Sequence, residues 1–223
     1  MIKAGIRQWG AQYPETLQFF DRLNMAQARW GLFSGTLLQL LGIRETDDHD
    51  VLVDGQGFDQ AARILQDARG IRPVRKEVYI ACGDGEKLHF RTQELSAQFE
   101  GKTVQIMRPA PVECSTGSEY YLAMTWLAAE KRAVETVRGV EVYAADPVDS
   151  LLSKAVMQRG QDSGKQDVWD TAMLGRHGDL DMAYLEMRAA EIRADARVTA
   201  FLAMHAGLFA LECAALDRDM MPV

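Results

Sequence analysis

The sequence has few cysteines and no excess of positive charge. Its three cysteines, Cys82, Cys114 and Cys213, stand far apart and lack metal-ligand spacing, which excludes a disulfide framework and a cysteine-based zinc site. We expect them to be small buried hydrophobic residues in a protein of the reducing cytoplasm. The formal net charge of -7 disfavours a broad basic surface for nucleic acid, although a local basic groove stays open.

Long apolar runs and low-complexity segments are also missing. The longest apolar stretch, residues 201–211, is interrupted by His205 and is shorter than the about 20 residues that cross a membrane. Residues 1–10 contain no apolar run typical of a signal peptide. Because 48% of the residues are hydrophobic and 26% are charged, the chain can form a buried core. We therefore expect a soluble protein with no membrane partner.

Hydrophobic spacing predicts an α+β fold with a helical C-terminal lobe. Before Asp146 we expect helices over residues 14–26, 36–42, 59–67 and 119–137, and strands over 29–33, 48–53, 74–80, 87–91, 103–107 and 140–143. After Asp146 the pattern is helical, over 147–159, 164–175, 180–193 and 196–216. The sequence thus predicts an α+β core over 1–146 and a helical lobe over 147–223.

The segment with the clearest chemistry is Arg44-Glu45-Thr46-Asp47-Asp48-His49-Asp50, which leads into the apolar run 51–53. On a strand, side chains alternate between the two faces, so Asp48 and Asp50 point to one side and His49 to the other. Adjacent carboxylates repel each other unless a cation lies between them, and hard oxygen ligands suit Mg²⁺. The pattern predicts a magnesium site, with a solvated acidic turn as the alternative; His49 is expected to be structural.

A second segment, Ser34-Gly35-Thr36, lies between a predicted strand and a predicted helix. Backbone N–H groups at the start of a helix attract phosphate. Gly35 lets a ligand approach the backbone closely, while the hydroxyls of Ser34 and Thr36 can add contacts. The alternative is an ordinary strand-to-helix connection in which Ser34 caps the helix.

Together these segments resemble the nucleotidyltransferase superfamily, the group that includes polymerase beta. They resemble most the abortive-infection type and related minimal nucleotidyltransferases, in which Gly-Gly-Thr-Ala-Leu precedes Arg-x-Ser/Thr-x-Asp-x-Asp. This chain has Ser34-Gly35-Thr36-Leu37-Leu38, followed by Arg44-x-Thr46-x-Asp48-x-Asp50.

The resemblance continues in the predicted helical lobe. Relatives carry Leu-Leu-x-x-Lys, then an Arg, then Lys-Asp-x-x-Asp. This chain has Leu151-Leu152-Ser153-Lys154, Arg159 and Lys165-Gln166-Asp167-Val168-Trp169-Asp170, so the similarity spans residues 12–175. The alternative for the charged residues of this lobe is a solvated helix face.

The resemblance implies a mixed β-sheet flanked by helices. It also implies Mg²⁺-dependent transfer of a nucleoside monophosphate from an NTP to a hydroxyl group of a small molecule, a protein or tRNA. Asp48 and Asp50 would be the catalytic and metal-binding residues. Six further residues would bind the nucleotide: Ser34, Gly35, Thr36, Arg44, Lys154 and Lys165.

The chain departs from the family at the third carboxylate, which in relatives completes a second metal site and helps deprotonate the acceptor. The strands predicted to supply it offer His89, Gln105 and Met107, and no acid. Ser34 also replaces the first glycine of the turn. A second hypothesis is therefore an inactive nucleotidyltransferase-fold protein with a binding or regulatory role, for example in a toxin–antitoxin pair. Methionine and leucine residues of 180–221 predict helix packing, which a second subunit could share.

Overall fold

A mixed β-sheet runs through the whole molecule. The structure is a computed structural model that describes residues 1–160, 165–177 and 180–206. Within them the strand order is β7-β6-β4-β5-β2-β1-β9-β8, with β3 paired to β4. The strands are β1 Trp30–Leu32, β2 Asp48–Val53, β3 Val74–Ala81, β4 Lys87–Phe99, β5 Lys102–Met107, β6 Pro111–Cys114, β7 Glu119–Tyr121, β8 Ala133–Val137 and β9 Val140–Ala144. The pairs β1–β9 and β2–β5 are parallel and the others antiparallel.

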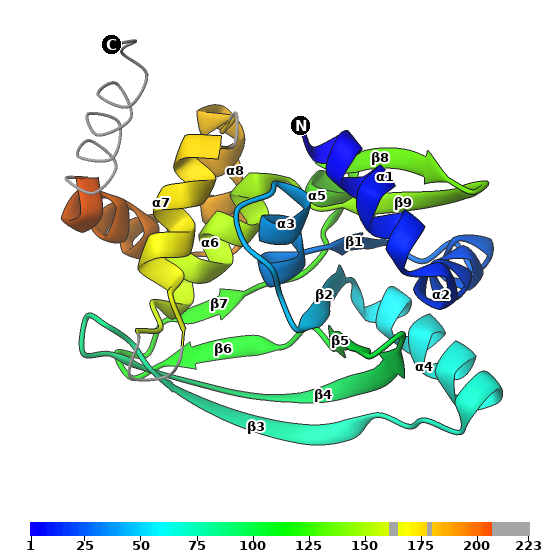
Figure 1. Ribbon diagram of the computed structural model, residues 1–223. Helices are drawn as coiled ribbons and strands as arrows, with labels where there is room; N and C mark the ends of the chain where they lie inside the picture. Colours follow the sequence, from blue (N-terminus) through cyan, green and yellow to red (C-terminus); the bar gives the residue numbers. More distant parts are fainter. Residues whose placement is uncertain (161–164, 178–179, 207–223) are drawn as a thin grey trace, which may run out of the picture.

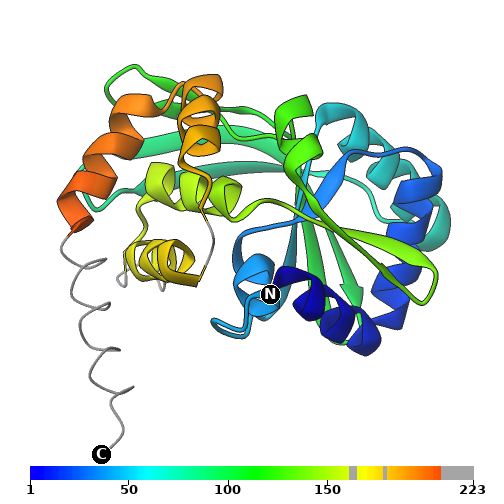
Figure 2. The same cartoon turned by 90° about the horizontal axis from the view of Figure 1, so that it is seen from above.

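Helices gather at the two ends of this sheet. They are α1 Ile2–Gln12, α2 Pro14–Met25, α3 Ser34–Leu40, α4 Gly55–Arg69, α5 Trp126–Lys131, α6 Pro147–Met157, α7 Asp167–His177 and α8 Met182–Glu191, and a further helix covers residues 195–206. Figures 1 and 2 show α6, α7 and α8 at one end and α1, α2 and α4 at the other, with α3 between the two groups. The predicted α+β fold with a mixed sheet and flanking helices is confirmed, and α6 begins directly after β9.

Local sequence signals explain several helix boundaries. Pro14 and Pro147 lie in the first turns of α2 and α6, where a missing backbone N–H has no cost. Asp146 caps α6 by accepting a hydrogen bond from the Val148 N–H at 2.9 Å. Gly70 ends α4 in the left-handed conformation, with φ 69°, which only glycine adopts readily.

The helix predicted over residues 119–137 is wrong. This segment contains β7, the short helix α5 and β8. Arg138 and Gly139 both have positive φ, 51° and 85°, which allows a tight two-residue turn and lets β8 pair with β9 as a hairpin. The β-branched Val134, Thr136 and Val137 favour this pairing.

The sequence-based prediction also missed two elements and placed one boundary late. α1 went undetected because only Ile6, Trp9 and Gly10 of its residues are buried. β6 begins at Pro111, the last residue of the Pro-Ala-Pro break, where no strand was expected. α4 begins at Gly55 rather than at Asp59, since Asp54 caps it by accepting a hydrogen bond from the Gly57 N–H. Part of the helix predicted over 196–216 lies outside the described residues.

Aromatic side chains form the core on the face of β2 that carries His49. The rings of Phe20 and Trp30 lie 4.2 Å apart, and the cluster of buried apolar residues extends without interruption into the C-terminal helices. A buried ion pair ties α8 to α6: Arg188 Nε donates to Asp149 Oδ1 at 2.8 Å, and the Tyr184 hydroxyl donates to Asp149 Oδ2 at 2.9 Å. The proposed division at residue 146 stays a prediction.

Two expectations from composition can be compared with the structure. Cys82 and Cys114 are buried and free, whereas Cys213 lies outside the described residues. Among the described residues, no helix has the length and apolar character needed to cross a membrane.

His49 is fully buried on the aromatic side of β2. The indole N–H of Trp9 donates to its Nδ1 at 3.5 Å, and Tyr13 meets the imidazole edge-on with ring centroids 4.6 Å apart. Burial, reinforced by the charge of Lys102, lowers the pKa of His49 from 6.5 to about 4. The histidine is therefore neutral and structural, as predicted.

We expect His49 to make the fold sensitive to mild acid. Its pKa is about 4 in the folded chain and 6.5 in an unfolded chain, so the unfolded chain takes up the proton first as the pH falls. Stability is therefore lost below about pH 6.5, and the loss from this residue reaches about 2 kcal/mol at pH 5. Urea unfolding at pH 7 and pH 5 measures this loss of stability.

The His49→Gln variant should lose about 2 kcal/mol less stability than the wild type between these pH values. A substitution of the exposed His177 should keep the full loss. An identical loss in His49→Gln would contradict the assignment.

Candidate functional site

Asp48 and Asp50 lie on one face of β2, as the alternation of the strand requires. His49, Val51 and Val53 are buried on the opposite face, whereas both aspartates are only partly buried. The Gly35 N–H donates to Asp50 Oδ2 at 3.2 Å, and the Thr46 hydroxyl donates to Asp48 Oδ1 at 3.0 Å. Within the described chain, the second oxygen of each carboxylate makes no hydrogen bond. Two oriented carboxylates thus keep one oxygen each available to a ligand.

The turn that begins α3 is built around these carboxylates. Ser34 has a positive φ of 52°, which costs a non-glycine residue about 1–2 kcal/mol. Its backbone N–H donates to the hydroxyl of the buried Ser150 on α6 at 2.9 Å. A Cβ atom on Gly35 would lie 3.0 Å from Thr46 Oγ1 and 3.4 Å from Asp50 Oδ2. The close approach of turn and carboxylate therefore explains the glycine at position 35.

Thr36 has a structural place in the site. Its side chain is fully buried, and its hydroxyl accepts a hydrogen bond from the Asp50 N–H at 2.8 Å. It thereby fixes the start of α3 to β2. The Ser34 hydroxyl, by contrast, makes no hydrogen bond in the described part of the chain and is partly exposed.

The electrostatic balance favours a cation beside Asp50. Burial raises the pKa of Asp50, and the charge of Asp48 raises it further. The Gly35 N–H and the charges of Lys154 and Arg159 act in the opposite direction. A cation bound between the carboxylates would relieve both the burial cost and the mutual repulsion.

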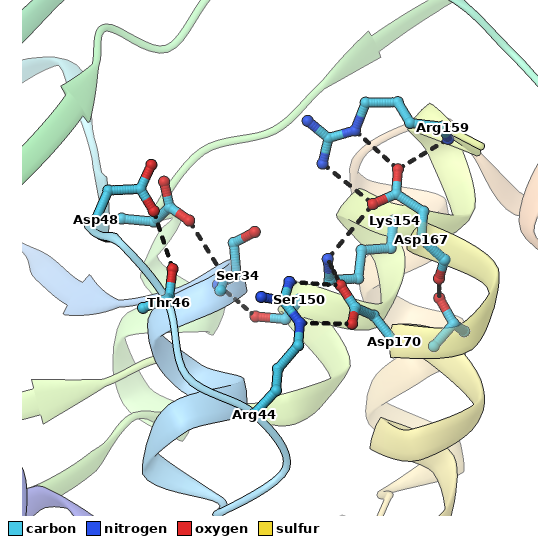
Figure 3. Close-up of polar contacts among 12 residues, drawn as sticks. Ser34, Arg44, Thr46, Asp48, Ser150, Lys154, Arg159, Asp167 and Asp170 are labelled. Atoms are coloured by element: carbon cyan, nitrogen blue, oxygen red, sulfur yellow. Dashed lines mark hydrogen bonds and ion pairs between the residues drawn. The ribbon is translucent and has the colours of Figure 1, made fainter. Parts of the chain in front are cut away.

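Five charged side chains form a continuous network beside the aspartate pair (Figure 3). Arg44 binds Asp170 with two nitrogens, at 2.9 and 3.0 Å. Lys154 Nζ lies 2.6 Å from Asp170 and 3.4 Å from Asp167. Arg159 Nε and Nη2 bind Asp167 at 2.8 and 3.1 Å. The network connects the loop before β2 with α6 and α7.

Lys154 is the buried centre of this charge network, with a side chain only 2% exposed. Burial would raise the pKa of Asp170, but the hydrogen bond from Arg44 and the charge of Lys154 outweigh it, so the pKa is lowered. Asp170 is therefore ionised at neutral pH. Arg44 and Arg159 are more accessible than Lys154, with side chains 36% and 22% exposed.

The structure brings most of the predicted site residues together. Ser34, Gly35, Thr36, Asp48 and Asp50 form one group, and Arg44 and Lys154 meet at Asp170. Lys165 is exposed before α7, and within the described chain its side chain has no partner.

Other members of the site had no predicted role. Thr46 and Ser150 hold the carboxylate and the turn. Asp167 and Asp170 were noted only as part of a matching motif. Their spacing of three residues, which places them on one helix face, was the available signal.

Gln105 lies where a third carboxylate was expected. β5 runs beside β2, and Gln105 pairs with Asp50 in the parallel register. The other strand considered, 87–91, is longer than predicted, because β4 continues to Phe99 and does contain an acid, Glu94. Glu94 binds Lys76 and accepts a hydrogen bond from Ser96 Oγ at 2.7 Å. Among the described residues, no group of three His, Cys, Asp or Glu side chains is arranged to hold a metal.

His89 lies at the other end of β4, away from the register shared with β5. Its ring stacks on Tyr79 at 4.4 Å, and its Nε2 lies 2.9 Å from Glu77 Oε1. It is a packed, partly exposed residue of the sheet.

Similar folds occur among solved structures. A Thermotoga maritima protein described as a candidate nucleotidyltransferase is 18% identical, with a TM-score of 0.42 over 59% of this chain and 78% of its own. An antigenic nucleotidyltransferase-like protein from Paracoccidioides brasiliensis is 13% identical, with a TM-score of 0.46 over 87% and 88%. The antibiotic-resistance factor ANT(2'')-Ia is 10% identical, with a TM-score of 0.40 over 92% and 97%.

The first two of these proteins are described as a nucleotidyltransferase and as nucleotidyltransferase-like, the superfamily that the sequence motifs resemble. At such identities and TM-scores the likeness concerns the fold and says nothing of activity or substrate. No protein-family model matches the chain, and no curated protein does so either.

Proposed function

We propose that this chain is an Mg²⁺-dependent nucleotidyltransferase that moves a nucleoside monophosphate from an NTP to a hydroxyl group. The observation that carries the proposal is the geometry of Asp48 and Asp50. They share one face of β2, and among the described residues each side chain is held by a single hydrogen bond that leaves its second oxygen unengaged. Hard carboxylate oxygens with free lone pairs fit Mg²⁺. When bound, the ion would neutralise phosphate charge on the leaving pyrophosphate.

Residues around the aspartates supply the remaining polar contacts for a triphosphate. The Ser34 hydroxyl is unengaged in the described chain, and the partly exposed guanidinium groups of Arg44 and Arg159 lie in the neighbouring network. Guanidinium groups match the planar geometry of phosphate oxygens. Lys154 contributes through its charge, since its amine is enclosed by two carboxylates. The exposed Lys165 has no competing partner among the described residues.

The acceptor can be a small molecule, a protein or tRNA. The net charge of -7 weakens the case for tRNA, because nucleic acid backbones are bound by basic surfaces. We place the reaction in the cytoplasm, since the free thiols of Cys82 and Cys114 suit a reducing compartment.

The second candidate function is that of an inactive nucleotidyltransferase-fold partner, such as one member of a toxin–antitoxin pair. Gln105 beside Asp50 favours it, because an amide cannot act as the acid–base carboxylate of an active relative.

Pyrophosphate release separates the two functions. The purified chain is incubated with each of the four NTPs and Mg²⁺, first alone, so that it serves as its own acceptor, and then with tRNA or cell metabolites. We expect pyrophosphate from at least one NTP, abolished by EDTA and by Asp50→Asn. Metal-dependent NTP binding without release would support the inactive partner. No NTP binding at all would contradict both.

A further inference from the structure

We infer that the nucleotide site is built for one divalent cation and that Gln105 sets this limit. The inference rests on the proposed function and specifies the metal content of the same site. In the register of the parallel strands β2 and β5, Asp48 pairs with Thr103 and Asp50 pairs with Gln105. Paired residues of neighbouring strands project to the same face. Gln105 is therefore the residue of β5 that lies beside the aspartate pair.

The Gln105 amide is available but neutral. It is partly exposed, and within the described chain it makes no side-chain hydrogen bond. Its carbonyl oxygen could be one ligand, yet it brings no charge. A second Mg²⁺ that shares Asp48 and Asp50 with the first must overcome repulsion between two divalent ions, and added carboxylate charge is what makes this possible.

Within the described chain, no acidic side chain occupies the place that a carboxylate at position 105 would have. The next residue on this face is Ser96, which pairs with Gln105 from the far side on β4. Glu94, two residues along β4, is neutralised by Lys76 and also bound by Ser96. In residues 1–160, 165–177 and 180–206, no three potential ligands form a metal-binding group.

The surrounding charges lead to the same conclusion. Four carboxylates, those of Asp48, Asp50, Asp167 and Asp170, face three cations, those of Arg44, Lys154 and Arg159. The three cations engage Asp167 and Asp170, so within the described chain the free oxygens of Asp48 and Asp50 are the ones left for metal ions. A second divalent ion at these oxygens would be repelled by the first, and no further protein carboxylate of the described chain offsets that repulsion. The neutral Gln105 side chain also cannot take the proton of the acceptor hydroxyl, as a carboxylate at this position could.

Counting bound Mn²⁺ tests the inference without a turnover measurement. Mn²⁺ is titrated into the intact chain saturated with an α,β-methylene NTP analogue, and free Mn²⁺ is followed by electron paramagnetic resonance. We expect one Mn²⁺ per chain for the wild type, two for Gln105→Asp, and one for Gln105→Asn, which matches aspartate in shape but adds no charge. Urea unfolding of each variant confirms that it is folded.

Any other Mn²⁺ count would contradict either the inference alone or the proposed function as well. Two Mn²⁺ in the wild type would overturn the inference while leaving the proposed function standing. One Mn²⁺ in a folded Gln105→Asp variant would show that residue 105 does not set the limit. No protein-bound Mn²⁺ in the wild type would overturn the proposed function and this inference with it.

Discussion

Replacing Lys154 with methionine is expected to destabilise the folded chain by about 3 kcal/mol. The amine is buried between Asp167 and Asp170, so its removal leaves two carboxylates in the interior with less compensation. The loss lies at the lower end of the about 3–5 kcal/mol typical of broken buried pairs, because Arg44 and Arg159 still bind one carboxylate each. The free energy of unfolding in urea measures it.

Two comparisons separate this effect from a general cost of losing a lysine. Lys165→Met removes an exposed lysine and should change stability by less than about 0.5 kcal/mol. Adding Asp170→Asn to Lys154→Met removes one of the two carboxylates that the loss of Lys154 leaves with less compensation, so the double variant should recover part of the loss. A loss below about 1 kcal/mol for Lys154→Met, as is usual for a surface pair, would show that the network is not a buried structural element.

Replacing Asp50 with asparagine is expected to weaken Mg²⁺-dependent nucleotide binding by about 100-fold or more, since loss of an outer-shell partner alone costs about 10–100-fold. Asparagine keeps the shape and can still accept the Gly35 N–H, but it removes the charge that would hold the ion. The folded structure should persist, because burial and the charge of Asp48 already penalise the carboxylate. Calorimetric titration with an α,β-methylene NTP analogue measures the affinity.

Asp47→Asn is the matched control, because Asp47 lies in the same segment, carries the same charge and is exposed. It should change the affinity by less than a factor of about 3, the effect of a screened surface charge. Equal weakening by Asp47→Asn and Asp50→Asn would mean that net charge, rather than the geometry of β2, controls binding.

The part of the site made by neighbouring residues could be predicted from the sequence. Strand alternation places Asp48 and Asp50 on one face, and the turn at Ser34 begins a helix, so two short patterns sufficed. The charge network could not be predicted in the same way. Arg44 and Asp170 are 126 residues apart, and only the tertiary fold pairs them.

Two errors in the fold prediction arose in segments whose structure depends on pairing with another strand. The α+β class followed from clear periodicity, but residues 119–137 combine helix-like apolar spacing with strand-forming residues at their end. Pairing with β9 decides the outcome for Val134 and Val137, and such pairing is invisible in a single segment. The acid in β4 was missed because the strand was taken to end at Arg91, whereas pairing with β5 extends it to Phe99.

Titration of the intact wild-type chain with an α,β-methylene NTP analogue, once in Mg²⁺ and once in EDTA, tests the proposed nucleotide site most directly. Because the ion would link Asp48 and Asp50 to the phosphates, we expect saturable binding in Mg²⁺ and its loss in EDTA. Equal affinity under both conditions, or no binding under either, would contradict it.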